Sequence, residues 1–127
     1  MEKSRFEIIS DLFKLSNVIS ESLKLAESLA GKSSGSGETD CKDICRNIRY
    51  SLKPLPFLLA GIREYVTEHE DKDLARKFVG LHDDTKRLHG ICSKYADLNK
   101  AAFRTGVAYL SMEVIRQYFF TEKEQDQ

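Results

Sequence analysis

Apolar residues recur along the middle of the chain at the spacing of one helix face. Between residues 41 and 66 they alternate steps of four and three, the period of an amphipathic α-helix. The members of this seam are Cys41, Cys45, Ile48, Leu52, Leu55, Leu59, Ile62 and Val66. Pro54 and Pro56 lie inside it, and a proline in a helix interior removes a backbone donor and clashes with the preceding turn, at a cost of about 3 kcal/mol or more. We therefore predict a helix from about Cys41 to His69 that bends near residues 53–57.

Three further segments show the same period. The first, Ser4–Ala30, ends at Gly31, a residue suited to capping a helix. Its apolar positions are Ile8, Ile9, Leu12, Leu15, Ile19, Leu23, Ala26 and Leu29 or Ala30. The third seam consists of Leu74, Phe78, Leu81, Thr85, Leu88, Cys92 and Tyr95. The fourth helix, which we expect to end near Phe120, has apolar positions at Leu98, Phe103, Val107, Leu110, Val114, Ile115 and Tyr118.

Each of these four stripes needs partners in order to leave water, and short connections favour neighbours that run in opposite directions. We therefore predict an all-α fold: an antiparallel up-down-up-down four-helix bundle with a proline-kinked second helix, in which the second and third helices pair as a hairpin. A chain of 127 residues has room for one such core, so residues 1–127 should form a single domain. Residues 32–39, KSSGSGET, are expected to be a flexible loop, natural or engineered, and residues 121–127, TEKEQDQ, a disordered acidic tail.

The composition is that of a soluble globular protein, with 41% apolar and 31% charged residues and a formal net charge of zero. A neutral chain has no overall attraction for nucleic acid or for an anionic membrane, so such attraction must come from local patches. No apolar run approaches ~18 residues, and the first six residues carry charges where a secretory signal needs an apolar core. Three cysteines, an odd number, favour reduced thiols. We therefore expect a cytoplasmic protein.

The sequence contains no nucleophile elbow, phosphate-binding glycine loop or convincing pair of catalytic carboxylates. We therefore expect no enzymatic activity, no cofactor and no small-molecule substrate. One cluster allows two interpretations. Cys41 and Cys45 lie one turn apart, and His89 and Cys92 lie on the third helix, so in a hairpin the four side chains could approach a tetrahedral zinc site. The thiols also lie on apolar seams, and we favour their burial as small apolar side chains.

Basic residues concentrate on the polar faces of the second and third helices. They are Lys42, Arg46, Arg49, Lys53, Arg76, Lys77, Lys86 and Arg87. In a hairpin these side chains would make one basic surface, which suits anionic lipid headgroups, an acidic protein partner or simple solvation. Nucleic acid is not expected as a partner, because the basic residues are not interleaved with exposed aromatic side chains.

The start of the first helix has an apolar arc wider than a simple seam, with charged residues on the remainder. The candidate residues are Phe6, Glu7, Ile9, Asp11, Leu12 and Phe13. An amphipathic helix of this kind can lie in a membrane interface once it is released from its bundle. The alternative is that Phe6 and Phe13 both pack into the core.

Two stretches carry a family resemblance. CRNIRYSLKPLPFLLAGIREY (Cys45–Tyr65) and LHDDTKRLHGICSKYADLN (Leu81–Asn99) are similar to parts of N-terminal four-helix-bundle domains from three groups. These are the mixed-lineage kinase domain-like pseudokinases, the plant powdery-mildew-resistance coiled-coil domains with the fungal HeLo domains, and the plant U-box proteins. In these families a basic second helix carries an L-x-P-L type element, matched by residues 52–55, and the third helix ends in a Cys-Ser-like pair, matched by Cys92 and Ser93.

For the first two groups the resemblance implies a non-enzymatic cell-death or immune module. Such a module would self-associate and engage the plasma membrane through its first helix, with Glu7 and Asp11 as pore-facing acids. For the U-box group it implies a protein-interaction adaptor, which would bind its partner through the basic surface of the second and third helices. We expect the first function and keep the adaptor as the alternative.

Overall fold

The computed structural model describes residues 2–32 and 38–125, which form helices with no β-strand among them. The elements are α1 (Arg5–Ala30), α2 (Glu38–Ser51), α3 (Leu55–His69), α4 (Lys72–Val79), α5 (His82–Cys92), the short 3-10 helix η1 (Ala96–Leu98) and α6 (Asn99–Gln125). The all-helical prediction is confirmed for these residues. α2 begins inside the predicted connector 32–39, of which residues 33–37 lie outside the described part. α6 continues through most of the segment predicted as a tail.

α1 begins at a capping box. The backbone N–H of Glu7 donates to the Ser4 hydroxyl (3.2 Å), and the backbone N–H of Ser4 donates to the Glu7 carboxylate (3.1 Å). These bonds satisfy donors that the start of a helix leaves open. One face of α1 is buried along its length, which confirms the first predicted seam. Its buried apolar residues are Ile8, Leu12, Leu15, Ile19, Leu23, Ala26 and Leu29.

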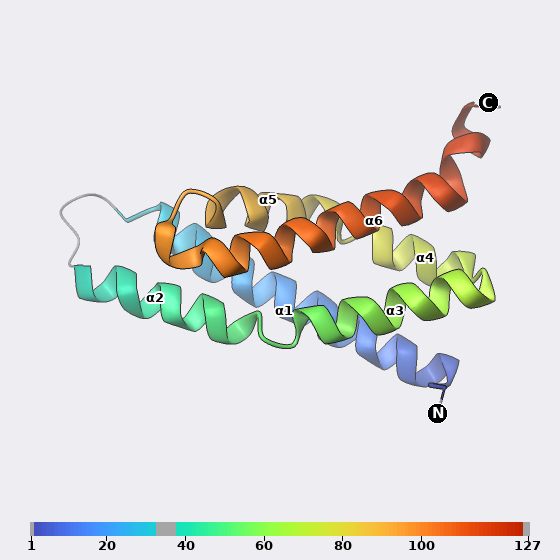
Figure 1. The fold of residues 1–127 in the computed structure, drawn as a ribbon, viewed down its shortest axis with the longest axis horizontal. Helices are drawn as coiled ribbons and strands as arrows, with labels where there is room; N and C mark the ends of the chain where they lie inside the picture. Colours follow the sequence, from blue (N-terminus) through green and yellow to red (C-terminus); the bar gives the residue numbers. More distant parts are fainter. Residues whose placement is uncertain (1, 33–37, 126–127) are drawn as a thin grey trace.

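The predicted kinked second helix is in fact two helices. α2 ends at Ser51 and α3 begins at Leu55, and in the turn between them the Leu55 N–H donates to the Leu52 carbonyl (3.1 Å). Pro54 and Pro56 therefore lie at the start of α3, where a missing backbone donor costs little. The two helices continue in the same general direction and meet at a shallow angle (Figure 1), and Leu52 and Leu55 are both fully buried. The apolar seam is continuous although the helix is not.

The predicted third helix is also divided, into α4 and α5, by a short turn. There the Leu81 N–H donates to the Phe78 carbonyl (3.1 Å), one residue closer than in an α-helix. Asp71 caps the start of α4: its carboxylate accepts from the Leu74 N–H (3.2 Å) and pairs with Arg5 of α1 (2.8 Å). The hydrogen bond from Arg5 lowers the pKa of this carboxyl. Asp71 thus joins the start of α4 to the start of α1.

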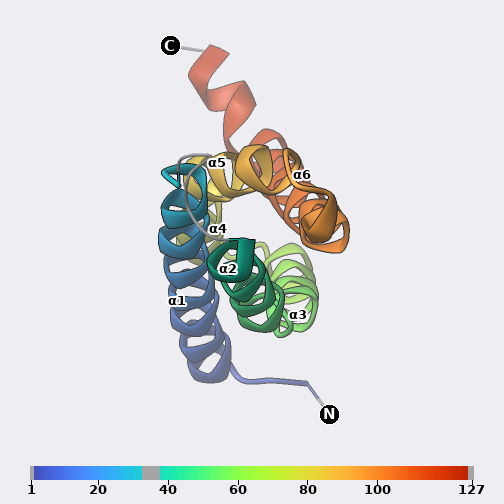
Figure 2. The same ribbon diagram turned by 90° about the vertical axis from the view of Figure 1, so that its left-hand side faces the viewer.

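The helices make four limbs: α1, α2 with α3, α4 with α5, and α6. α1 packs against α2, α3 and α5, and α6 packs against α3, α4 and α5. The second and third limbs therefore lie at opposite corners of the bundle, as the view along its long axis shows (Figure 2). The predicted hairpin is not formed along the length of these two limbs: α3 contacts α4, which follows it in the chain, but α5 packs against α1 and α6.

The chain reverses direction from limb to limb (Figure 1), but the neighbours α3 and α6 run the same way. The Arg49 guanidinium donates to the Asp97 carbonyl, and the Arg63 guanidinium donates to the Ser111 hydroxyl, both at 3.2 Å. The two residues of each pair are 48 apart in the sequence. The separation is the same for both pairs, so the second limb and α6 run in the same direction side by side. The up-down-up-down prediction thus describes the path of the chain, whereas side-by-side helices run in both senses.

α6 faces the core with a different side from the one predicted. Five of the predicted core positions are exposed: Phe103, Val107, Leu110, Val114 and Tyr118. The buried side is formed instead by Ala101, Thr105, Ala108, Met112, Ile115 and Phe119. Small residues on this side let α5 approach closely, since a Cβ added to Gly106 would lie 3.1 Å from the His89 ring. Of the predicted positions, Leu98 and Ile115 are buried.

Candidate protein-interaction surface

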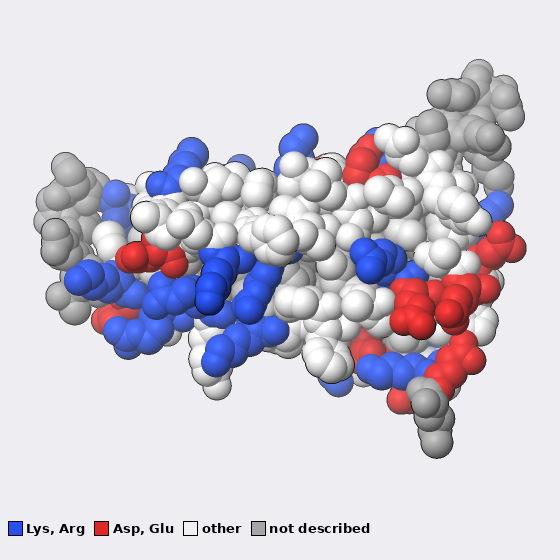
Figure 3. Space-filling view, in the orientation of Figure 1, with Lys and Arg blue, Asp and Glu red and all other residues white. Residues whose placement is uncertain are grey.

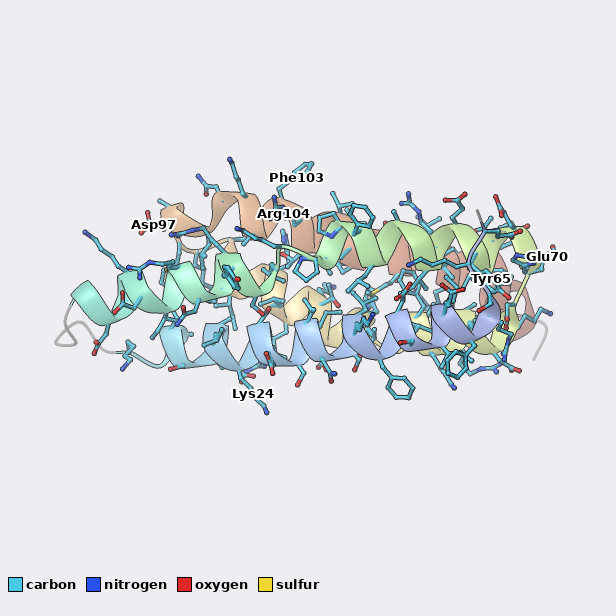
Figure 4. All side chains as sticks on the ribbon, turned by 90° about the horizontal axis from the view of Figure 1, so that it is seen from below. Lys24, Tyr65, Glu70, Asp97, Phe103 and Arg104 are labelled. Atoms are coloured by element: carbon cyan, nitrogen blue, oxygen red, sulfur yellow. The ribbon has the colours of Figure 1, made fainter. Side chains whose placement is uncertain are left out.

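The main exposed apolar feature is one side of α6. We call it the α6 stripe and define it as Phe103 (74% exposed), Val107 (40%), Leu110 (54%), Val114 (64%) and Tyr118 (62%). Its steps of four, three, four and four residues keep the side chains on one face, and the fifteen rises from first to last cover about 22 Å. Figure 4 shows Phe103 pointing away from the bundle.

The α6 stripe makes α6 apolar on two opposite sides. A helix at the surface of a monomer usually has one apolar side, and a helix that is apolar all round is usually buried all round. Contiguous apolar surface that monomers leave in water is a common mark of a binding site. The α6 stripe is therefore the strongest candidate for a functional surface in the described part of the chain.

Charges flank the α6 stripe unevenly. Lys and Arg side chains gather over α2 and the start of α6, and Asp and Glu side chains gather at the far end of α3 (Figure 3). Exposed or partly exposed basic residues of these elements are Lys42, Arg46, Arg49, Lys53, Lys100 and Arg104, and exposed acidic residues of α3 and its cap are Glu64, Glu68 and Glu70. The face formed by α2, α3 and α6 thus has a mainly basic end and an acidic end. Between them lie the α6 stripe and the exposed Arg63, which donates to Ser111 of α6.

The eight residues of the predicted basic surface are all exposed, but they do not make one surface. Lys42, Arg46, Arg49 and Lys53 lie on the second limb, whereas Arg76, Lys77, Lys86 and Arg87 lie on the third limb, at the opposite corner of the bundle. Three of them are paired with nearby acids: Arg46 with Asp43 (2.9 Å), Arg76 with Asp73 (3.7 Å) and Arg87 with Glu27 (3.1 Å). The prediction of a single basic hairpin is therefore wrong.

The candidate residues of the first helix divide between surface and core. Phe6 and Phe13 are 79% and 69% exposed, so the alternative that both pack into the core is wrong. Leu12 is buried, and Ile9 is partly buried against the core. Asp11 is also buried and pairs with Lys3 (2.7 Å).

Glu7, the other predicted pore-facing acid, lies in the capping box of α1. Both acids thus have structural roles in the folded bundle. Only the two phenylalanines of this set offer a large apolar surface to solvent.

The cysteine and histidine candidates are not brought together as a metal site. Cys45 and Cys92 are buried in the core, as the favoured interpretation predicted, and Cys41 is partly buried. Burial raises the pKa of the Cys92 thiol to about 11. His89 points instead toward α6, where its Nδ1–H donates to the Ala102 carbonyl (2.8 Å). Among the described residues, the group whose ligand atoms do converge is the exposed set Glu2, Glu68 and His69.

Sequence reasoning placed the α6 stripe in the core because its apolar side chains recur at helical spacing. The competing side was present in the sequence at helical spacing, as Ala101, Thr105, Ala108, Met112 and Ile115. Its small residues, together with Gly106, are the signal that could have identified the close contact with α5.

The fold and this surface define an all-helical bundle with one solvent-facing apolar helix side. Comparisons with models of known protein families, with curated proteins and with solved structures found no match to this chain. The resemblance to the pseudokinase, HeLo and U-box domains stays a prediction. Within the described ranges 2–32 and 38–125, none of the helices has both the length and the apolar character that crossing a bilayer requires.

Proposed function

We propose that this chain is a non-enzymatic protein-interaction module whose binding surface is the α6 stripe. The observation that carries the proposal is the exposure of five apolar side chains along one side of a helix whose other side is already buried. This surface, rather than the predicted basic hairpin, is the one that we assign to the adaptor function. A cell-death or immune role would use the same surface for association, and it stays a prediction from the resemblance alone.

Placing acids on the α6 stripe should weaken partner binding. The variant Val107→Glu with Val114→Glu puts two carboxylates where the partner would have to desolvate them without compensation. A protein captured with the wild-type chain is purified and titrated against both forms. We expect its Kd to rise at least about tenfold, which corresponds to 1.4 kcal/mol.

The matched control is Phe57→Glu. Phe57 is 87% exposed on α3, outside the α6 stripe, and its replacement puts one acid, where the stripe variant has two, in place of an exposed apolar side chain. Binding by this control should stay within about twofold of wild type, less than 0.5 kcal/mol. Equal binding by the stripe variant and the wild type would contradict the proposal.

A second candidate function, membrane contact through α1, is favoured by the exposure of Phe6 and Phe13. These residues are seven apart and so lie on the same side of the helix. Lys14 is exposed next to Phe13, and Lys77 of α4 lines the same shallow groove as Phe13. Two aromatic side chains with adjacent cations suit the interface of an anionic bilayer.

Membrane contact is tested with vesicles that contain phosphatidylserine. We expect the wild-type chain to sediment with them and the variant Phe6→Glu with Phe13→Glu to lose at least about 90% of that binding, because each acid removes an inserted side chain and adds repulsion. Both positions are exposed, so the fold should survive, unlike a change at the buried Leu12. Absence of wild-type binding at low salt would remove this second candidate.

A further inference from the structure

The α6 stripe reads the same in both directions. From its first residue to its last, the order of side chains is aromatic, valine, leucine, valine, aromatic. If a second α6 lay against it in the opposite direction, centred between residues 110 and 111, Phe103 would face Tyr118 and Val107 would face Val114. Leu110 of each copy would come level with residue 111 of the other, so the two Leu110 side chains would lie one residue apart along the axis, next to the centre. Large side chains would then meet at both ends and aliphatic side chains in the middle.

The charges that flank the α6 stripe also suit two copies in opposite directions, because one end of the face is basic and the other is acidic. The constant offset of 48 residues between the second limb and α6 places Glu70 level with Tyr118, at the acidic end of the face. Arg104 lies at the other end, and Figure 4 labels both residues. In the opposed arrangement, Arg104 of one copy comes opposite residue 117 of the other, within one residue of the level of Glu70. A parallel arrangement would instead set basic end against basic end.

From these two features we infer that the occupant of the α6 stripe is a second copy of this chain, bound about a two-fold axis with the two α6 helices running in opposite directions. This inference rests on the proposed function, because it names the partner of the same surface. A two-fold interface requires a patch that is complementary to itself. The order of side chains along the α6 stripe is complementary to itself, and so are the charges at the two ends of the surrounding face. Binding of an unrelated partner would require neither feature.

The first test measures the molar mass of the purified chain by light scattering and sedimentation from about 1 μM to about 1 mM. We expect the mass to rise with concentration from 14.5 kDa toward twice that value and to stop there, because a two-fold contact is closed. Val107→Glu with Val114→Glu should raise the dimer Kd at least about tenfold, and Phe57→Glu should leave it within about twofold. Circular dichroism confirms that each variant keeps its helical content.

The second test addresses the direction of the two helices by charge reversal. Arg104→Glu and Glu70→Lys should each raise the dimer Kd about fivefold or more, because each sets like charges against each other across the interface. The double variant restores opposite charges and should return to within about twofold of wild type. Glu70 has a left-handed backbone (φ 47°), and lysine carries the same backbone cost there as glutamate, so the reversal leaves local strain unchanged.

Three results would overturn the inference: a wild-type chain that stays monomeric throughout, a dimer that the stripe variant does not weaken, or a double charge variant that binds worse than either single one. The proposed function fails on a different measurement, the titration of a captured partner. A monomeric chain whose partner binding is lost in the stripe variant would refute the second copy and leave the interaction module standing.

Discussion

Replacing Phe78 with alanine is expected to lower the free energy of unfolding by about 3–5 kcal/mol, because it removes most of a large side chain from a packed core and leaves a cavity. Phe78 is fully buried on α4, within the single core cluster that all four limbs share. Urea denaturation followed by circular dichroism measures the change, as a lower midpoint at an unchanged dependence on denaturant.

The control for this prediction is Phe103→Ala. It removes the same side chain from α6, but Phe103 is 74% exposed, so the change should stay within about 0.5 kcal/mol in the monomer. The comparison is made at a low protein concentration, because association through the α6 stripe would couple the midpoint to concentration. Equal losses for the two variants would mean that the assignment of core and surface is wrong.

The replacement of Ala108 by glutamate is expected to prevent stable folding, with a loss of more than about 4 kcal/mol. Ala108 is fully buried on α6, so the longer side chain would displace its neighbours and the carboxylate would lose its hydration without a partner. The measurement is the helical signal at 222 nm with its thermal transition.

The adjacent residue provides the control. Val107 belongs to the α6 stripe and is 40% exposed, so a carboxylate there can turn to solvent, and Val107→Glu should fold with a stability within about 1 kcal/mol of wild type. The pair distinguishes the observed orientation of α6 from the predicted one, which placed Val107 in the core. Folding of the Ala108 variant together with unfolding of the Val107 variant would restore the predicted orientation.

Periodicity identified three of the four buried faces because each of those segments has one regular apolar seam along its length, and the apolar residues outside it are isolated or confined to one end. It could not place the interruptions, since the turn between α2 and α3 keeps Leu52 and Leu55 on the same side and leaves the pattern in phase. Nor could it choose which limbs are neighbours. The short connection at Glu70 and Asp71 could join α3 either to a neighbouring position or to the diagonally opposite position in the bundle. Which of the two forms depends on how all four apolar stripes pack together.

The candidate site was the part that sequence reasoning could least determine. On α6 two apolar sides compete at helical spacing. The side that packs near His89 includes small residues, which carry little hydrophobic signal, so the periodicity favoured the other side. On α1 the sequence left open whether Phe6 and Phe13 pack into the core or face solvent, because their exposure depends on the limbs beside α1. The opposite charges at the two ends of the face of α2, α3 and α6 come from segments that are far apart in the sequence, so only the fold brings them together.

The buried position of Cys92 means that alkylating reagents can report how often the bundle opens. Burial raises the pKa of its thiol to about 11, so the reactive thiolate is scarce at neutral pH, and the surrounding core excludes the reagent. Modification of Cys92 must therefore pass through states in which its shielding is lost, whereas the partly exposed Cys41 reacts from the closed molecule. The ratio of the two labelling rates then reports how often the bundle opens around Cys92, with native cysteines as the only labelled groups.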